Sequence, residues 1–103
     1  MPCAATRYTV GVIIGFRHKG LETLYRIGST RGVQVAHAAK LGRILAALDA
    51  ATSPTELNQP GYKLHRLQGA LKGHWSIWVN GNWRVTFRFV GADVELVDYQ
   101  DYH

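Results

Sequence analysis

The second half of the chain contains three histidines, His65, His74 and His103, among arginines and aromatic residues. An imidazole ordinarily has a pKa of about 6.5, so it can take and give a proton near neutral pH. A guanidinium group donates two hydrogen bonds at once to a phosphate, and aromatic rings stack on splayed bases. These groups suit RNA cleavage by internal attack, in which the 2′-oxygen attacks the adjacent phosphorus and the 5′-oxygen leaves.

Such a reaction needs a base for the 2′ proton, an acid for the leaving oxygen and cations for the charge on the phosphoryl oxygens. The candidates for catalysis and RNA binding here are His65, His74, His103, Lys72, Trp78, Arg84, Arg88 and Tyr99. Three histidines and Asp101 would be a conceivable metal site, but their spacing is not that of a typical ligand set. We therefore expect no metal and no other cofactor.

Some residues with chemical potential also have a purely structural interpretation. His37 falls on the apolar stripe of a predicted helix, His18 stands at a helix start, and His74 stands at a strand edge. Arg88 is expected opposite Glu95, where a cross-strand ion pair contributes only about a few tenths of a kcal/mol. For these residues packing, capping and surface pairing are the simpler explanations.

The charge is distributed unevenly along the chain. Residues 1–92 hold all 12 Lys and Arg and three of the 7 acids, a net charge of +9, whereas the last eleven residues hold the other four acids, a net charge of −4. A basic body indicates a polyanionic partner such as nucleic acid, although a merely basic protein would have the same composition. The 103 residues suffice for one small domain, and 47% hydrophobic residues suffice for its core.

Cys3 is the only cysteine, so neither a disulfide nor a thiolate zinc site can form within one chain. This composition indicates a reducing compartment, and we expect the cytoplasm. The apolar run at 10–16 is too short to span a membrane, and it lacks the basic flank of a signal peptide. We therefore expect no membrane association.

The first half of the chain is predicted to be mainly helical from its hydrophobic periodicity. The expected elements are a short strand at 12–16, a helix at 18–27 that ends at Gly28, and a long helix at about 33–51. A helical turn should follow, with Ser53 as its N-cap, Pro54 at the first helical position and Glu56 closing a capping box.

From residue 62 onward the period changes from 3.6 to 2, which predicts strands. They are expected at 62–68, 74–80, 83–90 and 93–102, with hairpin turns at 80–82 and 91–92. The predicted fold class is therefore α+β: a short N-terminal strand and two helices packed on one face of a small antiparallel sheet, with the other face open.

The register of the sheet decides which side chains share the open face. A three-residue loop at 80–82, with Gly81 or Asn82 in the left-handed conformation, would place both apolar sets of that hairpin on one side. In the last hairpin we expect Val90 opposite Asp93 and, in the same register, Arg84 opposite Tyr99. The open face would then carry His74, Ser76, Trp78, Arg84, Thr86, Arg88, Glu95, Val97 and Tyr99, and continue to Asp101 and His103.

Two kinds of tryptophan are expected in this sheet. Trp75 and Trp83 fall on the core face, whereas Trp78 falls on the polar face, where a large aromatic side chain suggests RNA or a protein as its partner. Arg84 has no acidic neighbour except in the last strand. Trp78 and Arg84 are therefore the open-face residues that most favour a functional interpretation.

Three segments resemble the HigB toxins of type II toxin–antitoxin systems, which belong to the RelE/ParE toxin superfamily. The segments are FRHKGLETLYRIGST, PGYKLHRLQGALKGHWSIWVNGNWRVTFRF and the terminal VDYQDYH, and the resemblance runs from about Phe16 to His103. It implies a RelE-like fold. It also implies a metal-independent endoribonuclease that cuts mRNA in the decoding site of the ribosome and so inhibits translation.

The resemblance also implies an active site. In that family a histidine in an LHxLKG segment, a lysine three positions later and a terminal Asp-Tyr-His form the site, and the matching residues here are His65, Asp101, Tyr102 and His103. Which histidine is the acid and which the base stays open. Arg84 would be the phosphoryl clamp.

Two positions depart from the family pattern. The lysine position reads Gln68, so a neutral amide replaces a cation, and Lys63 or Lys72 would have to substitute in binding the RNA phosphates. At the N-terminus, residues 1–11 look like a leader that precedes the toxin domain at 12–103. Val12 could then be an alternative start codon.

The resemblance further implies a HigA-type helix-turn-helix antitoxin as partner, with operator DNA bound only through that antitoxin. Two other functions fit the sequence. A ParE-like toxin would poison DNA gyrase, and the terminal Asp-Tyr-His argues against it. A catalytically weakened copy would bind RNA or antitoxin without growth arrest, and Gln68 is the feature that favours it.

Overall fold

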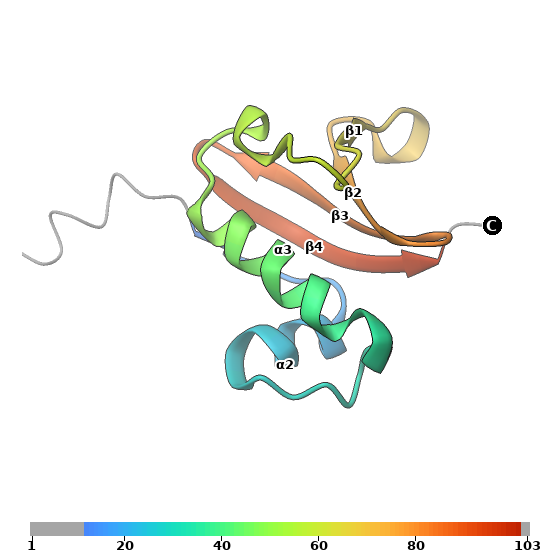
Figure 1. Cartoon of the computed structure of the whole chain (residues 1–103). Coiled ribbons are helices and arrows are strands. Elements are labelled where there is room, and N and C mark those ends of the chain that lie inside the picture. Colours follow the sequence, from blue (N-terminus) through green and yellow to red (C-terminus); the bar gives the residue numbers. More distant parts are fainter. Residues whose placement is uncertain (1–11, 102–103) are drawn as a thin grey trace, which may run out of the picture.

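The computed structural model describes residues 12–101, in which two helices pack on one side of a four-stranded antiparallel sheet (Figure 1). The helices are α2 (Lys19–Ile27) and α3 (Ala38–Ala50), with the 3-10 turn η1 (Val35–His37) leading into α3. The strands are β1 (His65–Arg66), β2 (Trp75–Asn80), β3 (Trp83–Val90) and β4 (Asp93–Asp101), in the order β1-β2-β3-β4. Two further 3-10 turns are η2 (Pro54–Leu57) and η3 (Gly69–Leu71). The predicted α+β class is confirmed.

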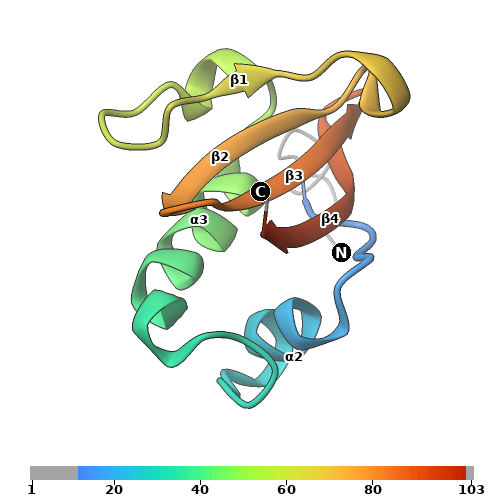
Figure 2. The ribbon, with the colours of Figure 1, turned by 90° about the vertical axis from the view of Figure 1, so that its right-hand side faces the viewer.

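Two predicted strands are shorter than expected. The N-terminal one is reduced to two isolated parallel bridges along β4, Ile13 with Val94 and Phe16 with Val97. The strand predicted at 62–68 is extended only at His65–Arg66. Lys63 has a positive φ of 48°, which an extended strand does not accommodate. Figure 2 shows β1 lying along the edge of the sheet, beside β2 and away from α2.

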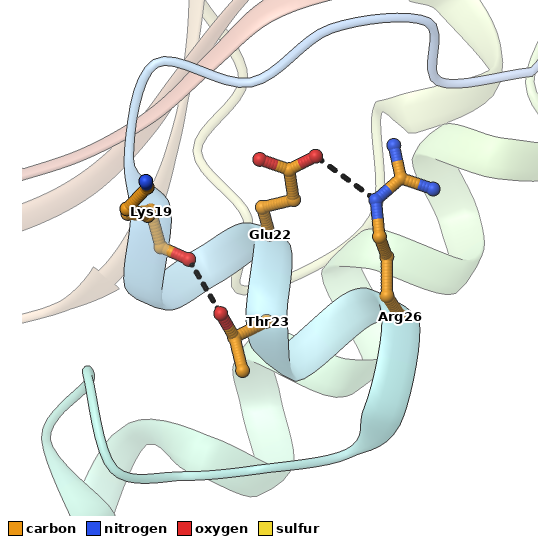
Figure 3. Close-up of polar contacts among 4 residues, drawn as sticks. All are labelled: Lys19, Glu22, Thr23 and Arg26. Atoms are coloured by element: carbon orange, nitrogen blue, oxygen red, sulfur yellow. Dashed lines mark hydrogen bonds and ion pairs between the residues drawn. The ribbon is translucent and has the colours of Figure 1, made fainter.

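Local contacts account for both ends and the outer face of α2. The Nδ1 atom of His18 accepts a hydrogen bond from the backbone N–H of Leu21 at 3.0 Å, so the predicted capping role is confirmed. Gly28 ends the helix with φ 75°. On the exposed face, Arg26 Nε donates to Glu22 Oε2 at 2.9 Å (Figure 3). The short helix is thus held at its start, along its surface and at its end.

The long helix α3 supplies the helical half of the core. Its buried residues are Leu41, Ile44, Leu45 and Leu48, as the periodicity predicted. Near its end, Asp49 Oδ1 accepts from the backbone N–H of Ile13 at 3.2 Å and from the Tyr25 hydroxyl at 2.8 Å. Burial, and then the Asp49 carboxylate, raise the pKa of Tyr25. One carboxylate therefore connects α3, α2 and the N-terminal segment.

The turn after α3 forms with Ser53 at the predicted N-cap position, but without the predicted capping hydrogen bonds. Pro54 begins η2 as expected, yet the Ser53 side chain makes no capping hydrogen bond. The Glu56 carboxylate instead accepts from the backbone N–H of Thr52 at 2.6 Å. The acid of the predicted capping box thus binds one residue earlier than expected, and the Ser53 hydroxyl lies 3.0 Å from the Thr55 hydroxyl instead of capping the turn.

The β2–β3 hairpin has the predicted apolar face but not the predicted three-residue loop, because Asn80 pairs with Trp83 and the loop is only Gly81 and Asn82. Ile77 lies opposite Val85 and both are fully buried, and Gly81 takes the left-handed conformation with φ 55°. A register shift between Trp78 and Asn80 brings the apolar residues of both strands onto the helix-facing side. The sheet half of the core includes Ile77, Val79, Val85, Phe87, Val94 and Val97.

The β3–β4 hairpin follows the predicted register only at its start. Val90 pairs with Asp93 and Arg88 with Glu95, but the register then shifts, and Arg84 pairs with Gln100 instead of Tyr99. Leu96, with φ 55°, is the extra residue of a bulge. The shift reverses the predicted faces of the rest of β4.

Candidate active site

A cavity on the open face of the sheet brings together two residues predicted for catalysis. It has a volume of about 430 Å³ and is lined by Lys63, His65, Leu67, Ser76 and Arg84. Three strands contribute, because His65 lies in β1, Ser76 in β2 and Arg84 in β3. His65 is exposed and lies directly opposite Ser76. Cleavage of a phosphodiester would require an imidazole for proton transfer and a guanidinium for the phosphate, and both line this cavity.

Lys63 adds a second cation to this cavity. Its Nζ lies 4.2 Å from the centre of the Trp78 ring, a cation–π contact, and its backbone is in the left-handed region. Because a lysine rarely adopts that conformation, the surrounding structure must impose it. Strain of this kind gathers at functional sites.

Trp78 has its partners within this chain. Its Nε1 donates to the carbonyl of Gly81 at 2.9 Å, and Lys40 Nζ lies 4.5 Å from its ring centre, in addition to Lys63. Two lysines of this chain therefore contact the indole, and the predicted role of Trp78 in binding RNA or a protein stays a prediction.

Lys40 extends the positive charge from the cavity toward α3. Its Nζ donates to the carbonyls of Gly61 and Val79, both at 3.1 Å. Burial lowers the pKa of Lys40, and the charges of Arg43 and Lys63 lower it further. Lys40, Arg43 and Lys63 are therefore close enough for their charges to interact, and Lys63 is the member of this group that lines the cavity.

Gln68 and Lys72 line a different cavity. This hollow, of about 270 Å³, is bounded by Arg66, Leu67, Gln68, Lys72 and Gly73. Leu67 lines both cavities, so they adjoin. Of the two lysines expected to substitute for the family lysine, Lys63 shares a cavity with His65 and Lys72 does not.

The predicted open-face position of Val97 and Tyr99 is wrong. Both are buried on the helix-facing side, where the Tyr99 hydroxyl lies 2.6 Å from His37 Nδ1 and its ring stacks on Trp83 at 4.4 Å. Burial raises the pKa of Tyr99. The prediction that Tyr99 is an RNA-binding residue of the open face is therefore wrong. The interpretation of His37 as a packed helix residue is confirmed.

Asp101 does not continue the open face either. It pairs with Trp83, which lies on the helix-facing side with Tyr99. Three strand spacings separate β1 from β4, which places the His65 and Asp101 backbones about 14 Å or more apart. Tyr102 and His103 lie outside the described residues. Of the predicted catalytic residues that the structure describes, His65 and Asp101 therefore stand at opposite edges of the sheet, with Arg84 on a strand between them.

The bulge brings other polar residues to the open face. Gln100 Nε2 donates to Thr86 Oγ1 at 3.0 Å and to Asp98 Oδ2 at 3.1 Å. The sequence carried a signal for this exchange, because uniform pairing would have put the apolar side chains of Val97 and Tyr99 in contact with water. Ser76 lies on the predicted open face, and it also lines the cavity, which no pattern in the sequence indicates.

Arg88 and His74 have other surroundings. Arg88 Nε donates to Glu95 Oε2 at 2.8 Å, which confirms the predicted ion pair. His74 is 8% exposed, and within residues 12–101 neither ring nitrogen has a hydrogen-bond partner. Over the same range, no three His, Cys, Asp or Glu side chains are grouped to hold a metal ion, and no helix is long and apolar enough to cross a membrane.

Comparison with known proteins places this fold and these residues in a family. Residues 14–103 match the RelE-like toxin of the type II toxin–antitoxin system HigB. This chain belongs to the HigB-like toxin family. It is 45% identical to Endoribonuclease HigB of Proteus vulgaris over 92 residues, which cover 89% of this chain and all of that protein. It is 37% identical to Toxin HigB-1 of Vibrio cholerae over 90 residues, covering 85% and 94% of the two chains.

Membership confirms the resemblance and the RelE-like fold predicted from the sequence. A toxin of a type II system is paired with an antitoxin, so an antitoxin is a partner of this HigB-like protein. The family match begins at residue 14, and the predicted leader at 1–11 lies outside the described residues. The leader therefore stays a prediction.

Proposed function

We propose that this HigB-like toxin is an endoribonuclease that cleaves mRNA on the ribosome by internal attack of the 2′-oxygen. The observation that carries the proposal is the open-face cavity, where His65, Arg84 and Lys63 meet. Its strongest support outside the structure is the 45% identity to a protein named Endoribonuclease HigB. The reaction needs two proton carriers and cations, and the cavity is lined by one such carrier, His65, and by the cations Lys63 and Arg84.

The residues divide the work by their chemistry. His65 exchanges a proton with the RNA or binds its phosphate, and Arg84 clamps the non-bridging oxygens with paired hydrogen bonds. Asp101, Tyr102 and His103 supply the second proton carrier from the end of β4. Because Asp101 lies at the other edge of the sheet from His65, on the helix-facing side, the C-terminal residues would have to move toward the cavity when RNA binds. No metal or other cofactor takes part.

The remaining partners follow the same proposal. The antitoxin is of the HigA type, a helix-turn-helix protein, and operator DNA is bound only through it. The ribosome supplies mRNA in a splayed conformation, so we expect activity on RNA alone to be weak. Such a toxin acts in the cytoplasm.

Expression from a tightly controlled promoter, with transcript 5′ ends mapped, tests the function. The parent should arrest growth and produce new 5′ ends within reading frames. His65→Ala, His103→Ala and a chain lacking His103 should do neither. Matching amounts of each protein would be verified by immunoblot, so that loss of activity is not loss of protein.

Two outcomes would redirect the proposal. Arrest that persists in the histidine variants without RNA cleavage would overturn the nuclease and point to gyrase as target. No arrest by the parent would point to the weakened copy that Gln68 suggests. In that case Gln68→Lys should restore killing.

A further inference from the structure

The buried hydroxyl of Ser76 lacks a hydrogen bond in the part of the chain that the structure describes, and the roles assigned so far to the cavity residues do not explain this. Its side chain is 1% exposed, and within residues 12–101 its hydroxyl has no hydrogen-bond partner. Buried polar groups in folded proteins are almost always hydrogen-bonded, because an unmade bond destabilises the folded state. A hydroxyl left in this condition at the wall of a functional cavity indicates a partner that arrives during function.

The neighbours of Ser76 identify that partner. His65 lies directly opposite Ser76 across the β1–β2 pair, so their side chains share one face with Cβ atoms about 5 Å apart. Both residues line the same cavity. His65 is exposed, so its ring is not held by packing. A catalytic imidazole ordinarily needs a fixed tautomer and a fixed orientation, which the bond of its second nitrogen provides.

We propose that Ser76 is a positioning residue for His65, an inference that rests on the proposed function. When RNA occupies the cavity, the His65 ring turns toward β2 and Nδ1–H donates to Ser76 Oγ. Nε2 is then directed into the cavity, where it takes or returns a proton of the RNA. A hydroxyl suits this task because it accepts from a neutral and from a charged imidazole without gaining charge itself.

The charged groups around His65 are consistent with this role. Lys63 and Arg84 face the same cavity, and both attract a phosphate but repel an imidazolium. Neither cation can accept the Nδ1–H bond. Ser76 is the lining residue of this cavity with an oxygen acceptor on its side chain.

Ser76→Ala separates a positioning role from a structural one. The change removes a hydroxyl that has no bond in the folded state, so the thermal midpoint should stay the same or rise. In a reconstituted translation reaction, single-turnover mRNA cleavage should fall on the order of 10-fold with toxin saturating. The residual cleavage of His65→Ala, followed over long reaction times with excess toxin, should not fall further when Ser76→Ala is added, because the two residues act as one unit.

Thr86→Val is the matched control. Thr86 is the cross-strand neighbour of Ser76, equally buried, and its hydroxyl already accepts from Gln100 at 3.0 Å. This variant should have a lower thermal midpoint and unchanged cleavage. The inference is supported if Ser76→Ala loses cleavage but not thermal stability, and Thr86→Val loses thermal stability but not cleavage.

Each other outcome has a definite meaning. A lower midpoint for Ser76→Ala, cleavage equal to the parent, or a further loss in the His65→Ala background would overturn the positioning role and leave the nuclease intact. Absence of cleavage by the parent would instead be a failure of the proposed function.

Discussion

At the scale of single residues, the positions that could act were easier to predict than their groupings. His65 and Arg84 were predicted from chemistry and family resemblance, and they share one cavity. The sequence did not separate Lys63 from Lys72, because the choice depends on a backbone turn at Lys63 that no local pattern indicates. The same holds for the partners of Trp78, since Lys40 lies in a distant helix.

Lys63 should supply the positive charge near the RNA phosphate that a lysine at the position of Gln68 supplies in the family pattern. Lys63→Met keeps an aliphatic stem against Trp78 but removes the cation from the cavity with His65 and Arg84. We expect mRNA cleavage to fall on the order of 10-fold to 100-fold, as when one donor to developing phosphoryl charge is removed. Cleavage would be measured by single-turnover primer extension.

Lys72→Met is the control for this prediction, because Lys72 lines the neighbouring cavity instead. It should change cleavage by less than about 3-fold, the effect of one distant charge on RNA attraction. Equal losses in the two variants would mean that both lysines act only through the general positive potential.

At the scale of elements, periodicity predicted which segments are helices and strands but not where a strand is interrupted. The helix at Lys19–Ile27 and the strand at Trp83–Val90 have the predicted extents almost residue for residue. No local pattern in the sequence indicates the bulge at Leu96, so uniform pairing back from the turn at 91–92 predicts the wrong faces beyond it. One extra residue was enough to exchange the faces of Tyr99 and Gln100. That exchange is why the candidate site lost Tyr99.

A close contact between α2 and the loop after it gives a prediction at this scale. The backbones of Gly20 and Gly32 touch, and a Cβ at Gly20 would lie 2.3 Å from the Gly32 carbonyl oxygen. Gly20→Ala should therefore lower the free energy of unfolding by about 1–3 kcal/mol, since neither backbone can move aside cheaply. Urea unfolding followed by circular dichroism measures the change.

Gly42→Ala provides the contrast in α3. A Cβ there meets no atom within 4 Å, so alanine should raise the free energy of unfolding by about 0.5–1 kcal/mol through its higher helix propensity. If both alanines stabilised the protein, the close approach of the two glycine backbones would be disproved.

At the scale of the whole molecule, one aromatic cluster joins the helical layer to the sheet. Tyr99 of β4 stacks on Trp83 of β3, bonds His37 before α3 and lies edge-on to His18 at the start of α2. No sequence pattern predicted this meeting, because its members are up to 81 positions apart and depend on the bulge. By contrast, the net positive charge of residues 1–92 and the net negative charge of the last eleven residues follow from the sequence alone, because net charge is a simple sum over residues.

This cluster should make stability sensitive to alkaline pH. The pKa values of Tyr99 and Tyr25 are raised from 10.0, mainly by burial. A group whose folded pKa is raised contributes stability that is complete below its unfolded pKa and is lost as pH rises through the folded value. Lys40, whose pKa is lowered from 10.5, acts in the opposite direction near pH 10, because its folded form sheds the buried charge first. With two tyrosines against one lysine, we expect the thermal midpoint to fall above about pH 10.

Tyr99→Phe tests the contribution of the cluster to that fall. At pH 7 the variant should be less stable by about 1–3 kcal/mol, because buried His37 loses its partner. Between about pH 9 and 11 its midpoint should decline less steeply than the parent's, since no hydroxyl remains to ionise when the two layers separate. Tyr62→Phe, which removes a phenol hydroxyl outside the cluster, is the matched variant for comparison. If the thermal midpoint of Tyr99→Phe declined as steeply as the parent's, the loss of stability at alkaline pH would have to come from Tyr25 or from the general charge. Ionisation of the Tyr99 hydroxyl between the helices and the sheet would then not be its cause.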